Sequence, residues 1–233
     1  MTTTRIVEVR AGILKKNDEL ARGLRGRFER DGVLTVNLVS SPGSGKTAFL
    51  ERTLSELVGA GVKAAALVGD LETDNDAQRL ARSGAPVRQI NTHGRCHLEA
   101  EMLGSYLDAW DLAALDYLFI ENVGNLVCPA SYDLGEALRV AMLSVTEGED
   151  KPLKYPTMFN SADVAIITKM DLAEACEFDR EAAHAAIRSV RPGMTILEVS
   201  TKRGTGMETW HTLLRERRAE WAPRVAGGEA SAR

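Results

Sequence analysis

The chain has 233 residues, of which 44% are hydrophobic, and this suffices to bury the core of one α/β domain. Lysine and arginine number 29 against 33 aspartate and glutamate, so the net charge is −4 and a basic field for nucleic acid is absent. The sequence has no signal-peptide h-region and no apolar run approaching about 18 residues. We therefore expect a cytoplasmic protein without nucleic-acid or membrane partners.

The periodicity of apolar residues predicts one helix followed by a series of βα units. Leu20, Leu24 and Phe28 recur at spacings of four among charged residues, which predicts an amphipathic helix over 13–30 that Asp31-Gly32 could stop. Short apolar runs then alternate with helical patterns, which is typical of a mostly parallel sheet flanked by helices. The predicted strands are 33–39, 62–68, 87–90, 117–120, 139–145, 164–167 and 195–199. Residues 147–156 read as a loop, and residues from 224 onward as an irregular tail.

Residues 40–47 (SSPGSGKT) follow the first predicted strand and open a helical pattern, as a phosphate-binding P-loop requires. Small residues let backbone N–H groups turn toward phosphate oxygens at the helix N-terminus. Lys46 would then reach the β- and γ-phosphates, and Thr47 would give its hydroxyl to Mg²⁺. Ser40 replaces the first glycine of the pattern, so a serine-rich turn that only caps a helix is the alternative. The residues predicted to bind the nucleotide are Gly43, Ser44, Gly45, Lys46, Thr47 and Ala48.

Acidic residues at the ends of neighbouring strands are the candidates for holding Mg²⁺. Asp70 follows one predicted strand and Glu121 follows another, where ligands bind in open parallel sheets. Glu121 and Gly124 have the spacing of the turn that senses the γ-phosphate in GTPases, although glutamate replaces the usual aspartate. Asp76 lies where a switch loop is expected, and a solvated acidic loop is the alternative there.

Two later segments predict which base is bound. Residues 168–171 (TKMD) and 200–202 (STK) each follow a predicted strand, where a GTPase keeps its guanine contacts. Asp171 would accept from the ring N–H and the exocyclic amine of guanine, a pattern that adenine lacks. Lys169 would lie along the base, and the backbone after Ser200 would meet the guanine carbonyl oxygen. Ser200, Thr201 and Lys202 are therefore predicted to bind the nucleotide. The pattern therefore favours guanine over adenine.

The cysteines and one histidine predict a transition-metal site. Three cysteines are an odd number, which argues for reduced thiols over a disulfide framework. Cys96 and His97 are adjacent and Cys128 precedes a proline, in two loops that should reach the same edge of the sheet. Thiolate and imidazole suit Ni²⁺ or Zn²⁺, with water or a second protomer completing the coordination. Inert buried cysteines are the alternative, and Cys176, in a segment predicted to be helical and acidic, is expected to be structural.

These motifs together resemble the HypB family, the nickel-incorporation GTPases of hydrogenase maturation. The resemblance runs over about residues 13–210 and is sharpest at NLVSSPGSGKT, GDLETDNDA, CHLEA and ENVGNLVCP. It implies a GTPase with GTP or GDP, Mg²⁺ and Ni²⁺ or Zn²⁺ as cofactors. It also implies a homodimer that forms in a nucleotide- or metal-dependent way, with Cys96, His97 and Cys128 as ligands at the interface. A hydrogenase maturation partner and the hydrogenase large subunit are the implied partners.

Many members of that family carry an N-terminal cysteine motif or a histidine-rich stretch, and no cysteine or histidine precedes His93 here. A metallochaperone role would then rest on the site in the GTPase domain and on a partner protein. We expect an N-terminal helical extension over 1–32 packed on the core, a P-loop GTPase domain with the metal site over 33–222 and a flexible tail over 223–233.

Three alternatives remain open from the residues. The first is a related nickel-delivery GTPase for urease, against which the ENVGNLVCP segment argues. The second is a metal-binding interaction protein with weak nucleotide turnover, against which Lys46 and Thr47 argue. The third is a nucleotide or metabolite kinase, which would require an arginine-rich lid that the second half of the sequence does not contain.

Overall fold

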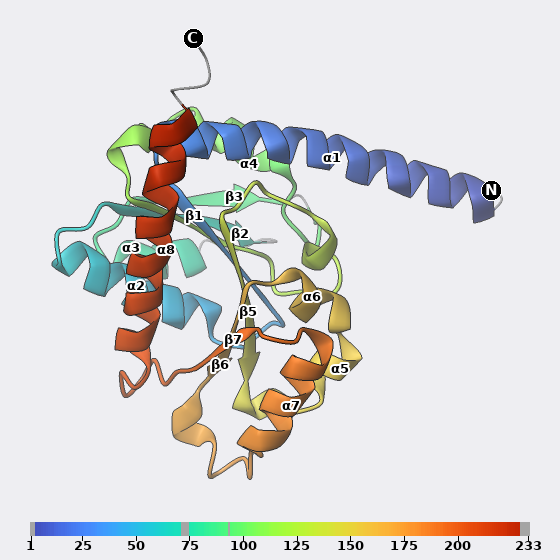
Figure 1. Ribbon diagram of the computed structural model, residues 1–233, viewed down its shortest axis with the longest axis vertical. Coiled ribbons are helices and arrows are strands. Elements are labelled where there is room, and N and C mark those ends of the chain that lie inside the picture. Colours follow the sequence, from blue (N-terminus) through green and yellow to red (C-terminus); the bar gives the residue numbers. More distant parts are fainter. Residues whose placement is uncertain (1–2, 71–74, 93, 229–233) are drawn as a thin grey trace.

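The computed structural model describes residues 3–70, 75–92 and 94–228 and shows an α/β fold around a seven-stranded sheet (Figure 1). Its strand order is β3-β2-β4-β1-β5-β6-β7, and all neighbouring pairs are parallel. The predicted fold class is therefore confirmed. The strands are β1 (Leu34–Ser40), β2 (Ala64–Asp70), β3 (Val87–Asn91), β4 (Tyr117–Glu121), β5 (Leu138–Ser144), β6 (Val164–Thr168) and β7 (Thr195–Glu198). Each lies within two residues of an apolar run in the sequence.

Helices cover both faces of the sheet, as its continuous apolar strands require. On one face lie α2 (Lys46–Gly59), α3 (Asn75–Ala81) and α8 (Met207–Gly228). On the other face, α1 (Thr3–Asp31) and α4 (Ala100–Leu107) cover β2 and β4, and α6 (Pro156–Ser161) and α7 (Arg180–Val190) cover β5 and β6. The short α5 (Lys151–Lys154) packs against α7. Four 3-10 turns complete the described structure: η1 (Leu112–Ala114), η2 (Pro129–Ser131), η3 (Val145–Glu147) and η4 (Met170–Leu172).

The N-terminal helix α1 runs across the top of the molecule in Figure 1 and is longer than the predicted 13–30. Ala21, Leu24 and Phe28 are buried against α4 and the sheet, whereas Leu20 is 39% exposed. The predicted apolar face is therefore wrong by one residue at its start. A strict spacing of four drifts around a helix of 3.6 residues per turn, so the small Ala21 takes the inward position instead.

Three other local predictions need correction. The irregular tail predicted from Arg224 is helical as far as Gly228, because extending an existing helix through residues such as alanine and arginine is easier than starting one. The loop predicted over 147–156 contains α5, whose first turn is favoured by Pro152. Cys176 lies in an exposed turn before α7, not in a helix. Residues 229–233 lie outside the described residues.

The parallel sheet fixes where a functional site can form. The carboxyl ends of all seven strands point to one edge, so the loops that follow β1, β2, β3, β4, β6 and β7 converge there. These loops carry the residues that the sequence predicts as nucleotide and metal ligands. In the described part of the chain, no helix has the length and apolarity to cross a membrane.

We predict that Phe28→Ala lowers the free energy of unfolding by about 3–5 kcal/mol, because Phe28 is fully buried between α1 and the core. Denaturant unfolding followed by circular dichroism measures this. Leu20→Ala, on the exposed side of the same helix, is the matched control and should change stability by less than about 1 kcal/mol. Equal effects of the two substitutions would show that α1 is not docked as described.

Candidate functional site

The phosphate loop joins β1 to α2 in the predicted strand, loop and helix arrangement. Gly43 and Gly45 have φ angles of 74° and 94°, in the left-handed region that glycine tolerates best. Lys46 folds back across the loop, and its Nζ donates to the Oγ of Ser40 at 2.8 Å. The serine that replaces the expected first glycine is therefore a buried partner of the lysine.

A cavity of about 490 Å³ opens beside this loop. Burial lowers the pKa of Lys46, and the carboxylates of Glu121, Asp76 and Glu147 act in the opposite direction by stabilising the ammonium. The described residues that line the cavity include the predicted Gly43, Gly45, Lys46, Thr47, Ala48, Asp76, Glu121 and Gly124. A buried ammonium beside open space suits the binding of an anion.

Hard oxygen donors gather on one side of that cavity. The Oγ1 of Thr47 donates to the Oε1 of Glu121 at 2.7 Å, and Asp76 lines the same space. Hydroxyl and carboxylate oxygens are the ligands that Mg²⁺ prefers, so these residues fit the ion. Asp70 ends β2 beside Asn91, with its side chain outside the described residues, as are residues 71–74 of the expected switch loop.

Gly124 lies against the phosphate loop itself. A Cβ atom at this position would come within 2.9 Å of the Cα of Pro42 and 3.0 Å of its nitrogen. Such distances are too short for any side chain, so glycine is required for the turn after β4 to approach the loop. The predicted sensor turn and the phosphate loop are therefore in direct contact.

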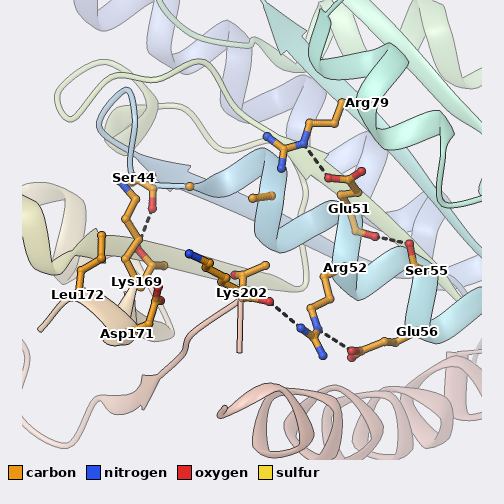
Figure 2. Close-up of a pocket in the computed structure, with 14 residues that line it drawn as sticks. Ser44, Glu51, Arg52, Ser55, Glu56, Arg79, Lys169, Asp171, Leu172 and Lys202 are labelled. Atoms are coloured by element: carbon orange, nitrogen blue, oxygen red, sulfur yellow. Dashed lines mark hydrogen bonds and ion pairs between the residues drawn. The ribbon is translucent and has the colours of Figure 1, made fainter. Parts of the chain in front are cut away.

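A second cavity, of about 790 Å³, adjoins the first and contains most of the predicted base-binding residues (Figure 2). One wall is formed by the segments after β6 and β7, and the opposite wall by α2. The predicted residues that line it are Ser44, Gly45, Ala48, Lys169, Asp171, Thr201 and Lys202. The two cavities share Gly45, Ala48 and Arg79, so a ligand could extend from one into the other.

Hydrogen bonds hold the residues of this cavity in place. The Oγ of Ser200 donates to Asp171 at 2.7 Å, and this bond lowers the pKa of Asp171 by stabilising its carboxylate. Ser200 does not line the cavity and instead orients Asp171. Thr168, which replaces the usual asparagine, donates to the carbonyl oxygen of Ser44 at 2.6 Å and so ties the β6 loop to the phosphate loop. Lys169 adds a second tie, donating to the carbonyl oxygen of Gly43 at 2.7 Å.

The predicted metal ligands Cys96, His97 and Cys128 lie together, with all three ligand atoms within 4.8 Å of one another. The two Sγ atoms are 3.1 Å apart, and the Sγ of Cys96 is 3.8 Å from the Nδ1 of His97. Burial lowers the pKa of His97, and Glu99 acts in the opposite direction. The lowered pKa favours the neutral imidazole, which is the form that binds metals. Two thiols and one imidazole within this distance fit a borderline transition metal.

Sequence reasoning missed the residues that support these ligands. Glu99 lies 3.2 Å from the Nε2 of His97, which leaves Nδ1 for a metal, and the ring of Tyr132 packs on the imidazole with centroids 3.9 Å apart. A carboxylate on the second histidine nitrogen is a usual partner of metal-binding histidines, so Glu99, two residues after His97, was a usable signal. Arg79, which lines both cavities and donates to Glu51 at 2.7 Å, gave no comparable signal.

One buried side chain connects the metal segment to the nucleotide side. Asn122, directly after Glu121, accepts from the backbone N–H of Leu98 at 3.2 Å and donates to the Oδ1 of Asn37 at 3.4 Å. The strand end that holds Glu121 is therefore bonded to the segment that carries Cys96 and His97. On its other side the same strand end leads through Gly124 to Cys128.

Comparisons with known proteins identify the family. The model of the CobW/HypB/UreG nucleotide-binding domain matches residues 34–198. The hydrogenase maturation factor HypB of Azotobacter vinelandii is 50% identical over 210 residues, which are 90% of this chain and 69% of that protein. The chain belongs to the HypB family of hydrogenase maturation factors.

Two comparisons with HypB of Helicobacter pylori, one of sequence and one of structure, support this assignment. The hydrogenase/urease maturation factor HypB of Helicobacter pylori is 42% identical and covers 92% of this chain, which covers 89% of that protein. The crystal structure of Helicobacter pylori HypB in complex with nickel superimposes with a TM-score of 0.83 at 42% identity, covering 88% of this chain and 96% of that one. The HypB resemblance inferred from the motifs is thus confirmed, and the matched nucleotide-binding domain supplies all the described lining residues of both cavities except Thr201 and Lys202.

We predict that Gly124→Ala weakens nucleotide binding and lowers stability by about 1–3 kcal/mol, because the new methyl group must displace Pro42. Thermal unfolding and titration with a fluorescent guanine nucleotide measure the two effects. Gly104→Ala in α4 is the control, since a Cβ there meets nothing within 4 Å and alanine favours the helix. Unchanged nucleotide affinity in Gly124→Ala would contradict the contact between the turn and the phosphate loop.

Proposed function

We propose that the protein hydrolyses GTP to GDP and phosphate and uses the nucleotide state to control the delivery of nickel during hydrogenase maturation. The observation that carries this proposal is the short stretch of chain, residues 121–128, that runs from the phosphate cavity to the cysteine and histidine cluster. A nucleotide site and a metal site that share one segment of chain suit a switch.

In this proposal, the phosphate loop binds the nucleotide phosphates with its backbone N–H groups, and Lys46 supplies positive charge to the transferring group. Thr47 would hold Mg²⁺ together with Glu121, Asp76 or Asp70. The ion, when bound, neutralises the charge that develops on the phosphate oxygens. The backbone N–H of Gly124, which lies against Pro42 of the phosphate loop, would donate a hydrogen bond to the γ-phosphate. Loss of that phosphate would remove the bond and allow the turn to move.

The larger cavity would hold guanine. Asp171 is ionised and held by Ser200, so both carboxylate oxygens face a defined direction. An ionised carboxylate accepts from the two N–H groups on one edge of guanine, and adenine offers no such pair. Lys169, Thr201 and Lys202 also line this cavity. Lys169 would lie along the base, and Thr201 and Lys202 would lie beside the guanine carbonyl oxygen.

Nickel is the cargo in this scheme, and Zn²⁺ is the other ion that the ligand set accepts. Cys96, His97 and Cys128 supply three ligands, which leaves a position for water, a second protomer or a receiving protein. Glu99 would fix the orientation of the imidazole through its contact with Nε2 of His97. An incomplete protein ligand set suits a site that must pass its ion onward.

We propose a nucleotide- or metal-dependent homodimer that acts in the cytoplasm with a hydrogenase maturation partner and the hydrogenase large subunit. Its HypB-family membership supports this assignment. Urease is the second candidate recipient, since the relative from Helicobacter pylori is a hydrogenase/urease maturation factor.

We predict that Lys46→Ala lowers the turnover of GTP by roughly a hundred-fold or more, because the lysine supplies charge that the transition state requires. Phosphate release under saturating nucleotide measures this. Lys63→Ala, at an exposed position before β2, is the control and should retain the parent rate. Unchanged turnover in Lys46→Ala would contradict the phosphate site.

Asp171→Asn should weaken GTP binding by about 2 kcal/mol and gain relative affinity for xanthine nucleotides, whose ring offers an acceptor where guanine has its amine. Competition between GTP and XTP for the parent and the variant measures the change in preference. An Asp171→Asn protein that still favours GTP as strongly as the parent would rule out this residue as the base reader.

Cys128→Ala should lose nickel and zinc binding, whereas Cys176→Ala, in an exposed turn, should keep it. Because the ligands are thiolates, binding in the parent should release protons and weaken as the pH falls. Titration followed by thiolate-to-nickel absorption measures both effects. The assignment of the cluster fails if the two cysteine variants bind metal with the same affinity.

A further inference from the structure

Asn17 is a buried polar side chain in the middle of α1, with 5% of its surface exposed. Its Oδ1 accepts from the backbone N–H of Ala100 at 2.9 Å, and its Nδ2 donates to the backbone carbonyl oxygen of Asp133 at 2.8 Å. One partner is a donor and the other an acceptor, so an amide is the side chain that satisfies both. The two partners are far apart in the sequence and belong to different segments.

These two segments are the ones that carry the predicted metal ligands. Ala100 begins α4 directly after the turn of Cys96, His97 and Glu99. Asp133 lies in the segment that follows Cys128, just after the η2 turn and its C-cap Tyr132. Asn17 of α1 therefore links the segment that carries Cys96 and His97 to the segment that carries Cys128.

Additional contacts hold the Cys128 segment against the same helix. Arg25 donates to both carboxylate oxygens of Asp133, at 2.8 and 2.9 Å. Gly135, with a φ of 79°, lies so close to α1 that a Cβ would come within 2.7 Å of the carbonyl oxygen of Ala21. The backbone of this segment is therefore pressed onto the helix, where Asn17 bonds to it.

We propose that Asn17 is a positioning residue for metal binding, which holds the Cys96–His97 segment and the Cys128 segment at the separation that one ion requires. The inference rests on the proposed function of the cluster. Ligands from two segments must be brought together before they can share an ion. A bond that already fixes their separation reduces the conformational entropy that is lost when the ion binds, and so strengthens binding. Without Asn17, a buried N–H and a buried C=O also lose their partners, which drives the two segments to rearrange.

The test compares nickel affinity in the full chain between the parent, Asn17→Leu, Asn17→Asp and Phe28→Leu, using competition with a chelator and thiolate-to-nickel absorption. Asn17→Leu removes both bonds at similar volume and should weaken nickel binding about ten-fold, as loss of a supporting contact typically does. Asn17→Asp keeps the acceptor for Ala100 and loses the donor to Asp133, so it should also weaken binding. Phe28→Leu destabilises the same helix but leaves the bonds of Asn17 to both segments in place, and a chain that stays folded should bind nickel as the parent does.

The proposal is overturned if the Asn17 variants bind nickel as tightly as the parent, or if Phe28→Leu weakens binding by the same factor as they do. If Asn17→Leu does not fold, Asn17→Asp decides by the same two criteria. Cys128→Ala separates the two levels of inference. If it binds nickel as the parent does, the metal site itself fails and the role of Asn17 with it. If it loses nickel while the Asn17 variants do not, only the role of Asn17 is rejected.

Discussion

The contact between Gly124 and Pro42 is the constraint on which the proposed switch depends. Because no side chain fits between them, the turn after β4 lies directly against the phosphate loop, and a shift of the loop toward the turn has to displace the turn. The same turn begins at Glu121, which bonds to Thr47, and continues to Cys128 in the metal cluster. Asn122 adds a second path, from the end of β4 to Leu98 beside His97. A change at the phosphate side therefore has two short routes to the metal ligands.

Much of the fold and of the site could be predicted because the deciding signals are local in the sequence. Apolar runs predicted every strand, since a parallel sheet buried on both faces requires them. The phosphate loop could be predicted from residues 40–47 and the strand and helix patterns on either side of them. Even the grouping of Cys96, His97 and Cys128 could be expected, because loops that follow parallel strands meet at one edge.

The remainder depends on contacts between distant segments, which periodicity does not encode. The inward position of Ala21 and the exposure of Leu20 follow from how α1 meets α4. Ser200 was predicted among the nucleotide-binding residues from its place after β7, and only the tertiary structure shows that its hydroxyl orients Asp171. Asn17 was indistinguishable from an ordinary polar residue of an amphipathic helix until its two backbone partners were brought together by the fold. In each case the role of the residue depends on contacts with segments that are distant in the sequence, and these contacts are seen only in the tertiary structure.

The central claim is that nucleotide and metal are coupled through residues 121–128, and coupling between two binding sites must be reciprocal. The most direct measurement is nickel affinity of the parent in the GDP-bound state and in the state bound to a non-hydrolysable GTP analogue, with the converse titration of both nucleotides with and without nickel. The account predicts that nickel affinity differs between the two states and that the ratio of nucleotide affinities changes by the same factor when nickel is bound. Equal nickel affinity in the two nucleotide states would contradict it.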